Sequence, residues 1–347
     1  MKRIHFVHAA GAATMLLLLA ACHKDKPEPP VQGQGQTATG HGVYITNEGN
    51  FQWGNASVGW YDPATGQATE DLYAAANGTG MGDVCQSMCL HDGKAYIVLN
   101  NSAKVTVVDA ETFVATATIT GFSSPRYFLP VGNGKAYVTE MSGNKVRVVD
   151  LNTSTIIGSI ACAGVTQELA LAAGKVFITN ESKPYVYVVD PATDAITDSV
   201  AVSRGGGTLT SDADGMLWVA CTGGGGTPAA LYRIDPQTVE VANTVPIPGP
   251  RISPWRLRAN GTGDTLYLLN GDVYRLSITD AAFPSAAFIP ANGRNLYGLG
   301  IDPLDGNIYV ADAIDYVQRG KVYQYAANGA EVGNFLAGRI PNGFVFR

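Results

Sequence analysis

The chain has 347 residues, of which 46% are hydrophobic and 15% are charged, with a net charge of −6. This composition is sufficient to bury a core and excludes intrinsic disorder for most of the chain. Lysine and arginine are scattered singly, which excludes the basic stripe that nucleic-acid binding requires, so no nucleic-acid partner is expected.

Residues 1–21 have the features of a secretory signal peptide. Lys2 and Arg3 precede an apolar run that is too short for a membrane span. The run ends in Leu19-Ala20-Ala21-Cys22, which resembles the lipobox of bacterial lipoproteins. That resemblance implies lipidation of Cys22, which would then become the mature N-terminus held at a membrane. The alternative is an ordinary signal peptide followed by a chance cysteine.

Residues 22–41 are rich in proline, glycine and glutamine, a composition that favours a flexible tether. The charged start of this segment, residues 23–26, loosely resembles the signal that sends some lipoproteins to the outer face of the outer membrane. We therefore expect a lipid-anchored, surface-exposed protein whose folded domain spans residues 42–347.

One pattern recurs seven times within that domain. It consists of an aromatic-centred run such as AYVTE, a polar turn, a second alternating run such as KVRVVD, and an Asp-x-x-Thr turn. The Asp of that turn recurs at intervals of 40 to 47 residues in five copies, and copies six and seven lack it. The aromatic residue in second place is present in all seven: Tyr44, Tyr96, Tyr137, Phe177, Trp218, Tyr267 and Tyr309.

This spacing is typical of propeller blades that have four strands each. The first copy begins directly with its second strand, whereas residues 341–346 at the C-terminus have the pattern of a first strand. The sequence therefore predicts an all-β, seven-bladed β-propeller, closed by the C-terminal strand as the first strand of blade one. The repeated aromatic residue is interpreted as packing between blades.

The runs VYITN, VFITN and AYVTE, followed by V-x-V-V-D-x-x-T, resemble the YVTN (YncE-type) β-propeller repeat. The resemblance covers residues 42–347 and implies the same seven-bladed fold.

Ligands of propellers usually bind where the loops between second and third strands and the loops between blades crowd one end of the channel. The loops between strands present Phe51, Trp53, Asp315 and Tyr316, and the blade entrances supply a second polar and aromatic set. Glu140 breaks a ring of mostly Asn residues at the ends of the aromatic runs. The predicted ligand-binding residues are Phe51, Trp53, Gln86, Arg126, Tyr127, Glu140, Gln167, Trp255, Arg256, Tyr297, Asp315 and Tyr316.

Each assignment has a structural alternative. The Asn and Asp residues that close the runs could simply start turns, Trp53 could pack on its own blade, and Arg126 and Arg256 could form salt bridges between blades. Asp212–Gly215 and Asp302–Gly306 are interpreted as turns, since neither has the downstream glutamate of a calcium loop.

Residues for catalysis are sparse. Only His91 lies within the predicted domain, which argues against a histidine-dependent mechanism, and no catalytic residue, cofactor or metal site is predicted. A metal held by Glu48, Glu140, Glu181 and Asp312 remains the alternative, as in a lactonase or lyase. Cys85, Cys89, Cys162 and Cys221 are interpreted as free small hydrophobic residues, although sequence leaves their pairing open.

The lipobox, the tether, the propeller and the aromatic first loop together resemble the BtuG-type surface lipoproteins. That resemblance implies capture of cobalamin or another corrinoid as ligand, and its transfer to a TonB-dependent outer-membrane transporter. A metal-dependent enzyme and a protein-binding scaffold are the two alternatives.

Overall fold

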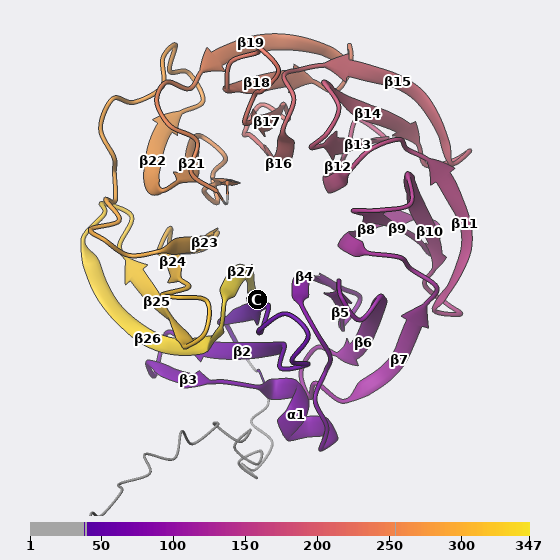
Figure 1. Ribbon diagram of the computed structural model, residues 1–347, viewed down its shortest axis with the longest axis vertical. Coiled ribbons are helices and arrows are strands. Elements are labelled where there is room, and N and C mark those ends of the chain that lie inside the picture. Colours follow the sequence, from indigo (N-terminus) through magenta and orange to yellow (C-terminus); the bar gives the residue numbers. More distant parts are fainter. Residues whose placement is uncertain (1–37, 39, 254) are drawn as a thin grey trace, which may run out of the picture. The chain divides into compact units, whose positions relative to one another are not determined.

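Seven antiparallel sheets follow one another around a ring in the computed structural model (Figure 1), which describes residue 38, residues 40–253 and residues 255–347. All of these belong to one unit, residues 32–347. The predicted signal peptide, Cys22 and most of the predicted tether lie outside the described residues.

The first four blades each contain four strands, ordered from the channel outward. Blade one has β27 (Pro341–Phe346), β1 (Val43–Asn47), β2 (Ser57–Asp62) and β3 (Gln67–Thr69); blade two has β4 (Cys85–His91), β5 (Lys94–Leu99), β6 (Lys104–Asp109) and β7 (Ala115–Thr120); blade three has β8 (Pro125–Gly132), β9 (Lys135–Glu140), β10 (Lys145–Asp150) and β11 (Thr155–Ala161); blade four has β12 (Thr166–Ala172), β13 (Lys175–Asn180), β14 (Tyr185–Asp190) and β15 (Ala195–Ala201).

The last three blades continue the ring. Blade five has β16 (Gly206–Ser211), β17 (Leu217–Cys221), β18 (Ala230–Asp235) and β19 (Glu240–Pro246); blade six has β20 (Arg256–Ala259), β21 (Thr265–Asn270) and β22 (Asp272–Ser277); blade seven has β23 (Leu296–Ile301), β24 (Ile308–Asp312), β25 (Arg319–Tyr325) and β26 (Glu331–Arg339). In blade six, the outermost position is reduced to a single bridge between Val273 and Ile289. That blade is one of the two whose sequence lacks the Asp-x-x-Thr turn.

The predicted closure of the ring is confirmed. Strand β27 pairs antiparallel with β1, with Ile45 opposite Phe344, so the C-terminal strand lies beside the first strand of the domain (Figure 1). Closure joins the first and last strands of the domain in one sheet, so neither is left as an unpaired strand at the junction of the ring.

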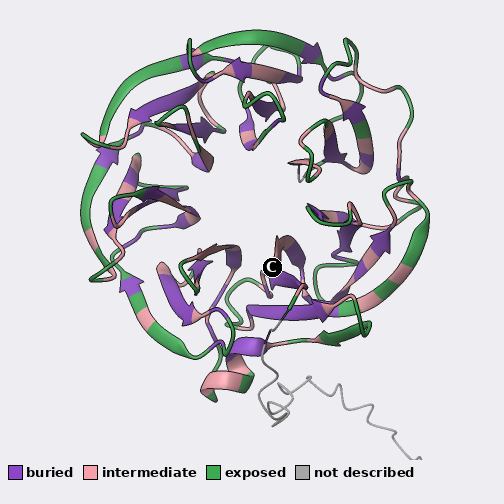
Figure 2. Cartoon of the chain, turned by 180° about the vertical axis from the view of Figure 1, so that it is seen from behind, coloured by how far each residue is buried: buried purple, intermediate pink, exposed green. Residues whose placement is uncertain are grey.

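The repeated aromatic residue forms the core between blades, as predicted. All seven side chains are buried, and two of them donate hydrogen bonds to the following blade: Tyr44 Oη to Ala110 O at 2.6 Å, and Tyr137 Oη to Asp194 Oδ1 at 2.5 Å. Figure 2 shows the result, with buried inner strands and largely exposed outermost strands. The repeat therefore specifies the contacts that hold neighbouring blades together.

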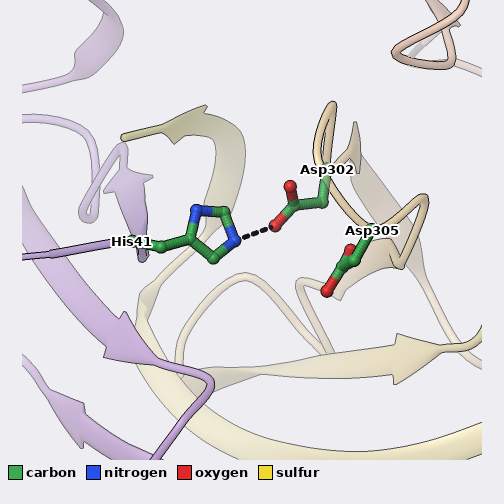
Figure 3. Close-up of side chains that lie close together, drawn as sticks. All are labelled: His41, Asp302 and Asp305. Carbon is green, nitrogen blue, oxygen red and sulfur yellow. Dashed lines mark hydrogen bonds and ion pairs between the residues drawn. The ribbon is translucent and has the colours of Figure 1, made fainter.

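The chain enters the ring at an anchored segment, so the prediction of a flexible tether up to residue 41 is wrong at its end. Ala38 is buried and its N–H donates to Glu111 O at 3.0 Å. The two ring nitrogens of His41 lie 2.8 Å from Arg347 O and 2.9 Å from Asp302 Oδ2 (Figure 3). These contacts tie the start of the domain to its C-terminus and to blade seven.

The short helix α1 (Leu72–Asn77), between blades one and two, was not predicted from the sequence. Asp71 caps its start by accepting from Ala74 N at 3.0 Å, and Gly78 ends it with a φ of 68°. Asp before an Ala-rich run with Asn-Gly at its end is a recognisable helix signal.

The four cysteines of the domain are free, and Cys85, Cys162 and Cys221 are buried. This agrees with their interpretation as small hydrophobic residues. Asp212 and Asp302 do start turns, as predicted: Asp212 Oδ1 accepts from Asp214 N, and Asp302 Oδ1 accepts from Leu304 N.

Candidate functional site

A β-bulge interrupts the innermost strand of six blades at the same place, close to where that strand begins. The register shifts there against the second strand in blades one to five and in blade seven. A bulge re-aims the side chain of the extra residue. The bulged residues are Asn342, Gln86, Arg126 with Tyr127, Gln167 with Glu168, Gly207 and Tyr297.

The threonine of the YVTN-like run supports three of these bulges. Thr46 Oγ1 donates to Asn342 Oδ1 at 2.6 Å, Thr139 Oγ1 accepts from Tyr127 N at 3.1 Å, and Thr179 Oγ1 donates to Glu168 O at 2.9 Å. All three threonines are buried. The repeat therefore fixes the backbone of the bulge, while the bulged side chain differs from blade to blade.

Side chains from blades seven and one meet at Glu48, which follows β1, and one of them also contacts the backbone of blade two. Tyr297 Oη donates to the Glu48 carboxylate at 3.3 Å, and Asn342 Nδ2 donates to Glu48 Oε1 at 3.1 Å. The same Asn342 group also donates to the backbone oxygen of Gln86 at 3.1 Å. Burial raises the pKa of Glu48 above its ordinary value, although Arg256 and Arg126 oppose that shift.

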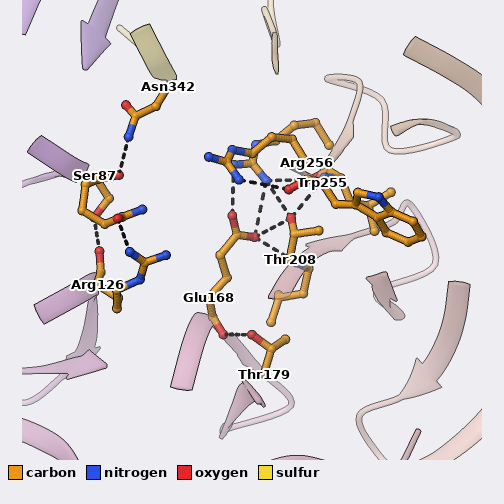
Figure 4. Close-up of polar contacts among 12 residues, drawn as sticks. Ser87, Arg126, Glu168, Thr179, Thr208, Trp255, Arg256 and Asn342 are labelled. Carbon is orange, nitrogen blue, oxygen red and sulfur yellow. Dashed lines mark hydrogen bonds and ion pairs between the residues drawn. The ribbon is translucent and has the colours of Figure 1, made fainter. Parts of the chain in front are cut away.

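Arg126 continues this network into blade three (Figure 4) and, through Gln167, into blade four. Its guanidinium donates to the side-chain oxygen of Gln86 and, through Nε, to Gln167 Oε1 at 2.9 Å. Gln167 in turn donates to Glu181 Oε2 at 2.7 Å. Hydrogen bonds thus connect five neighbouring blades, through side chains throughout except at the backbone oxygen of Gln86.

The network is interrupted at blade five, where the bulged residue is Gly207. A Cβ added there would meet no atom of the described chain within 4 Å, and the backbone of Gly207 is outside the left-handed region. The neighbouring Thr208 accepts from Leu257 N at 3.1 Å, so β16 contacts β20 of blade six at the residue after Arg256.

A cavity of about 280 Å³ lies within this ring of strands. Its lining includes Gln86, Tyr127, Arg256 and Asn342 near the start of the innermost strands. Deeper in the cavity, along the same strands, an ion pair joins two of the lining residues: Arg258 Nη2 is 3.1 Å from Glu168 Oε1. Thr208 donates to the other oxygen of that carboxylate, Glu168 Oε2, at 2.8 Å.

Aromatic side chains stand on the loops at the same end of the channel. Phe51 and Trp53 are 63% and 73% exposed, in the loop between β1 and β2. Tyr316, in the loop between β24 and β25, packs edge-on against Tyr297 with ring centroids 5.6 Å apart. The two loops are joined by a hydrogen bond from Asn50 Nδ2 to Tyr316 O at 2.7 Å.

Two predicted ligand-binding residues are buried in structural roles instead. Glu140 is fully buried, pairs with Arg147 Nε at 2.8 Å and accepts from Ser123 N at 2.9 Å. Trp255 is buried in the core between blades five and six, and its Nε1 donates to Asn270 Oδ1 at 2.9 Å. These two side chains have no polar group left for a ligand, which corrects the prediction for both.

A third predicted residue, Asp315, is exposed and caps its own turn, accepting from Val317 N and Gln318 N at 2.9 Å each. These hydrogen bonds lower the pKa of Asp315 to about 2. Two of the run-closing residues hold turns in the same way: Asn180 Oδ1 accepts from Lys183 N, and Asp312 Oδ1 accepts from Ile314 N. The turn alternative therefore describes these positions. Asn100 and Asn270 instead bond to segments that lead into the innermost strand of a blade, since Asn100 Nδ2 donates to Ser124 Oγ and Asn270 Oδ1 accepts from Ile252 N.

The carboxylates proposed as an alternative metal site are not gathered. Among the described residues, the one grouping of three metal-ligand side chains is His41, Asp302 and Asp305 (Figure 3). Asp302 follows the last residue of β23, whereas the bulged Tyr297 is near its first, so this group lies at the opposite end of the channel from the bulges.

Glu168 and Asn342 belong to the blade entrances identified in the sequence but were not among the predicted ligand-binding residues, and Arg258 was not considered; all three line the cavity. Glu48 was considered only as a ligand of the alternative metal site, and Gly207 was not considered as part of a binding site. The signal for a bulge is subtle, because a single extra residue in a β run does not change its composition. Comparison of run lengths between copies would have been the only indication.

The fold and the ring of bulged side chains define a seven-bladed β-propeller with a candidate binding site at one channel mouth. The family model described as a domain of unknown function, DUF5074, matches residues 41–339. The chain therefore belongs to the DUF5074 family. No curated protein matches it.

Solved structures with the same fold include a quinoprotein alcohol dehydrogenase-like protein from Bacteroides thetaiotaomicron. That protein is 16% identical, with a TM-score of 0.70 over 89% of this chain and 79% of the other. A protein from Bacteroides fragilis, provisionally named as a 6-phosphogluconolactonase, is 13% identical, with a TM-score of 0.68 over 88% of this chain and 98% of the other. At these identities, the likeness concerns the fold alone. Within the described residues, no helix has the length and hydrophobicity of a membrane span.

Proposed function

We propose that this protein captures a bulky, polar small molecule at the channel mouth and does not convert it chemically. The observation that carries the proposal is the ring of bulges. Six innermost strands have a β-bulge at the same place, and the side chain at the bulge differs between almost all of these blades. A scaffold needs no such variation at one end of its channel, whereas selective binding does.

The size of the cavity suggests how such a ligand sits. A volume of about 280 Å³ is just below the range of about 300–1,000 Å³ that is typical of small-molecule sites, so the cavity accepts one arm of a bulky ligand rather than the whole. The remainder would lie on the rim, where Phe51, Trp53 and Tyr316 offer aromatic surface at a small cost in side-chain entropy.

Cobalamin or another corrinoid is the leading candidate, because a broad macrocycle with polar arms matches this division between rim and cavity. The lipobox-like sequence at Cys22 adds a membrane anchor to the proposal, and transfer to a TonB-dependent outer-membrane transporter would follow capture. The corrinoid would be a ligand and not a cofactor.

Calorimetric titration with cyanocobalamin tests the corrinoid proposal. We expect saturable one-to-one binding that weakens about tenfold in Tyr127→Ala, in the cavity, and in Trp53→Ala, on the rim. Val332→Ala is the matched control, because Val332 is also exposed but lies on the outermost strand β26. Absence of binding by the folded wild type would exclude a corrinoid, and unchanged affinity in both variants would place the site elsewhere.

A further inference from the structure

The charges at the channel mouth are not balanced by direct contacts. Among the described residues, Arg126 and Arg256 form no ion pair, although both are partly buried and both act electrostatically on Glu48. Arg258, one strand position deeper on the same face of β20 as Arg256, has the carboxylate of Glu168 as its partner. Two arginines of the channel thus lack the partner that the third possesses.

Arg126 is positioned by neutral groups. The two amide oxygens that accept its hydrogen bonds belong to Gln86 and Gln167, and both of those side chains are buried. Amide oxygens orient a guanidinium but leave its charge in place. Burying a charge without a counter-charge is costly, which favours an anion at this point.

Arg256 has more N–H donors without a partner among the described residues than Arg126 has. Its one hydrogen bond in the described structure runs from Nη1 to Trp255 O at 3.0 Å, and its guanidinium carbon lies 5.9 Å from the centre of the Tyr297 ring. A guanidinium has five N–H donors arranged to bind a carboxylate or phosphate through two parallel hydrogen bonds. Arg256 also lines the cavity, so a ligand in the cavity can reach its guanidinium.

Glu48 is the nearby carboxylate, and its own hydrogen bonds go elsewhere. It accepts from Asn342 and Tyr297, while Arg126 and Arg256 act on it without an ion-pair contact. Burial favours the neutral form of this carboxyl group. When Glu48 is protonated, the two arginines are left without a counter-charge.

We propose that the channel mouth is an oxyanion receptor in which Arg126 and Arg256 bind a carboxylate or phosphate carried by the captured ligand. This inference rests on the proposed capture function and names the chemical class of the arm that enters the cavity. The aromatic rim then selects the body of the ligand, and the arginines select its charged arm.

The test uses the folded domain and two probes, inorganic pyrophosphate for phosphate and citrate for carboxylate, titrated by calorimetry at low ionic strength. We expect saturable binding of at least one probe, weakened about tenfold or more by Arg126→Gln and by Arg256→Gln, and weakened by added salt. The probe that binds more tightly identifies the source of the oxyanion. Arg204→Gln is the matched control, since Arg204 is exposed in the loop between β15 and β16 and forms no ion pair with the described residues.

Thermal melts of each variant establish that it is folded before its titration is interpreted. Failure of both probes to bind the wild type would overturn the oxyanion receptor, as would equal loss in Arg204→Gln. Cyanocobalamin separates this inference from the capture proposal. If it binds wild type and the double variant Arg126→Gln/Arg256→Gln equally well, capture stands and the oxyanion receptor is wrong.

Discussion

The two ends of the channel are built from the same seven blades but treat polar groups in opposite ways. At the end where the chain enters, His41 is in contact with Asp302 and with Arg347 O, and the Asp-x-x-Thr turns satisfy their own backbone groups. At the mouth, Arg126 and Arg256 lack carboxylate partners among the described residues, and Gly207 leaves an opening. The contacts at the first end hold the ring together, whereas the second end has charged groups without carboxylate partners, and it is there that we propose a ligand binds.

This difference shows where the repeat stops determining the structure. The buried aromatic residues and the turns recur because every blade must pack against the next in the same way. The backbone bulge recurs in six blades, whereas the side chain at the bulge differs between them. The backbone feature that orients the side chain is therefore shared by these repeats, and the identity of the side chain is not. Variation confined to one position of a regular repeat is what a grafted binding site looks like.

The largest expected effect contrasts two tryptophans. Trp218 is fully buried between blades and donates to Asp212 Oδ2 at 2.8 Å, whereas Trp53 is 73% exposed on the rim. Trp218→Ala should lower the free energy of unfolding by about 3–5 kcal/mol, and Trp53→Ala by no more than about 0.5 kcal/mol. Chemical denaturation measures both, and a large loss in Trp53→Ala would show that the rim loop is part of the core.

A smaller effect is expected at the entry end of the ring. His41→Ala removes the group that faces the fully buried carboxylate of Asp302, so the free energy of unfolding should fall by about 1–3 kcal/mol. His91→Ala provides the control, because His91 faces the exposed Asp92 at 3.2 Å and such pairs contribute about 0–1 kcal/mol. Equal losses in the two variants would mean that His41 does not fasten the ring.

The smallest effect on stability concerns Glu48 and has a definite sign. Its pKa is raised in the folded chain from an ordinary value of 4.5, so its contribution to stability is present below that value and is lost as pH rises through the higher folded pKa. Glu48→Gln should therefore flatten the decline of melting temperature with pH. Glu240→Gln, on the exposed strand β19, should leave the pH profile unchanged.

The same Glu48→Gln variant bears on the mouth. It keeps this side chain neutral at every pH, so pyrophosphate should bind the variant more tightly than wild type wherever Glu48 is ionised, and this difference should grow as pH rises through the raised pKa of Glu48. Weaker binding would show that Glu48 orients the arginines rather than competing for them.

The fold could be predicted from the sequence because the same strand-and-turn pattern occurs in seven copies. The aromatic residue, the Asp turn and the C-terminal strand each have a local pattern, and together they specify blade number and closure. It failed at the last residues of the tether because Ala38 and His41 have the composition of a linker, and their partners, such as Glu111 and Asp302, lie far away along the chain.

The candidate site could be predicted from the sequence only in part, for a different reason. Gln86, Arg126, Gln167 and Tyr297 were predicted because the blade entrances align, but their grouping in the structure depends on bulges that displace a side chain by one register position. Trp255 aligns with them and is nevertheless buried in the core, because β20 begins at the next residue and has no bulge over its paired residues. Gly207 could not be predicted as a site position, because a search for functional side chains passes over a residue that contributes only open space.

The most direct test of the account fills the opening at Gly207. Gly207→Gln gives blade five the kind of side chain that the other bulges carry, at a backbone position that accepts it. Gly333→Gln is the control, on the outermost strand β26, where a Cβ would also be tolerated. Titrated with pyrophosphate and with cyanocobalamin, Gly207→Gln should lose about tenfold or more in affinity for whichever ligand binds wild type, while Gly333→Gln and the melting temperatures stay the same. Unchanged affinity in Gly207→Gln would contradict the claim that ligands enter at this mouth.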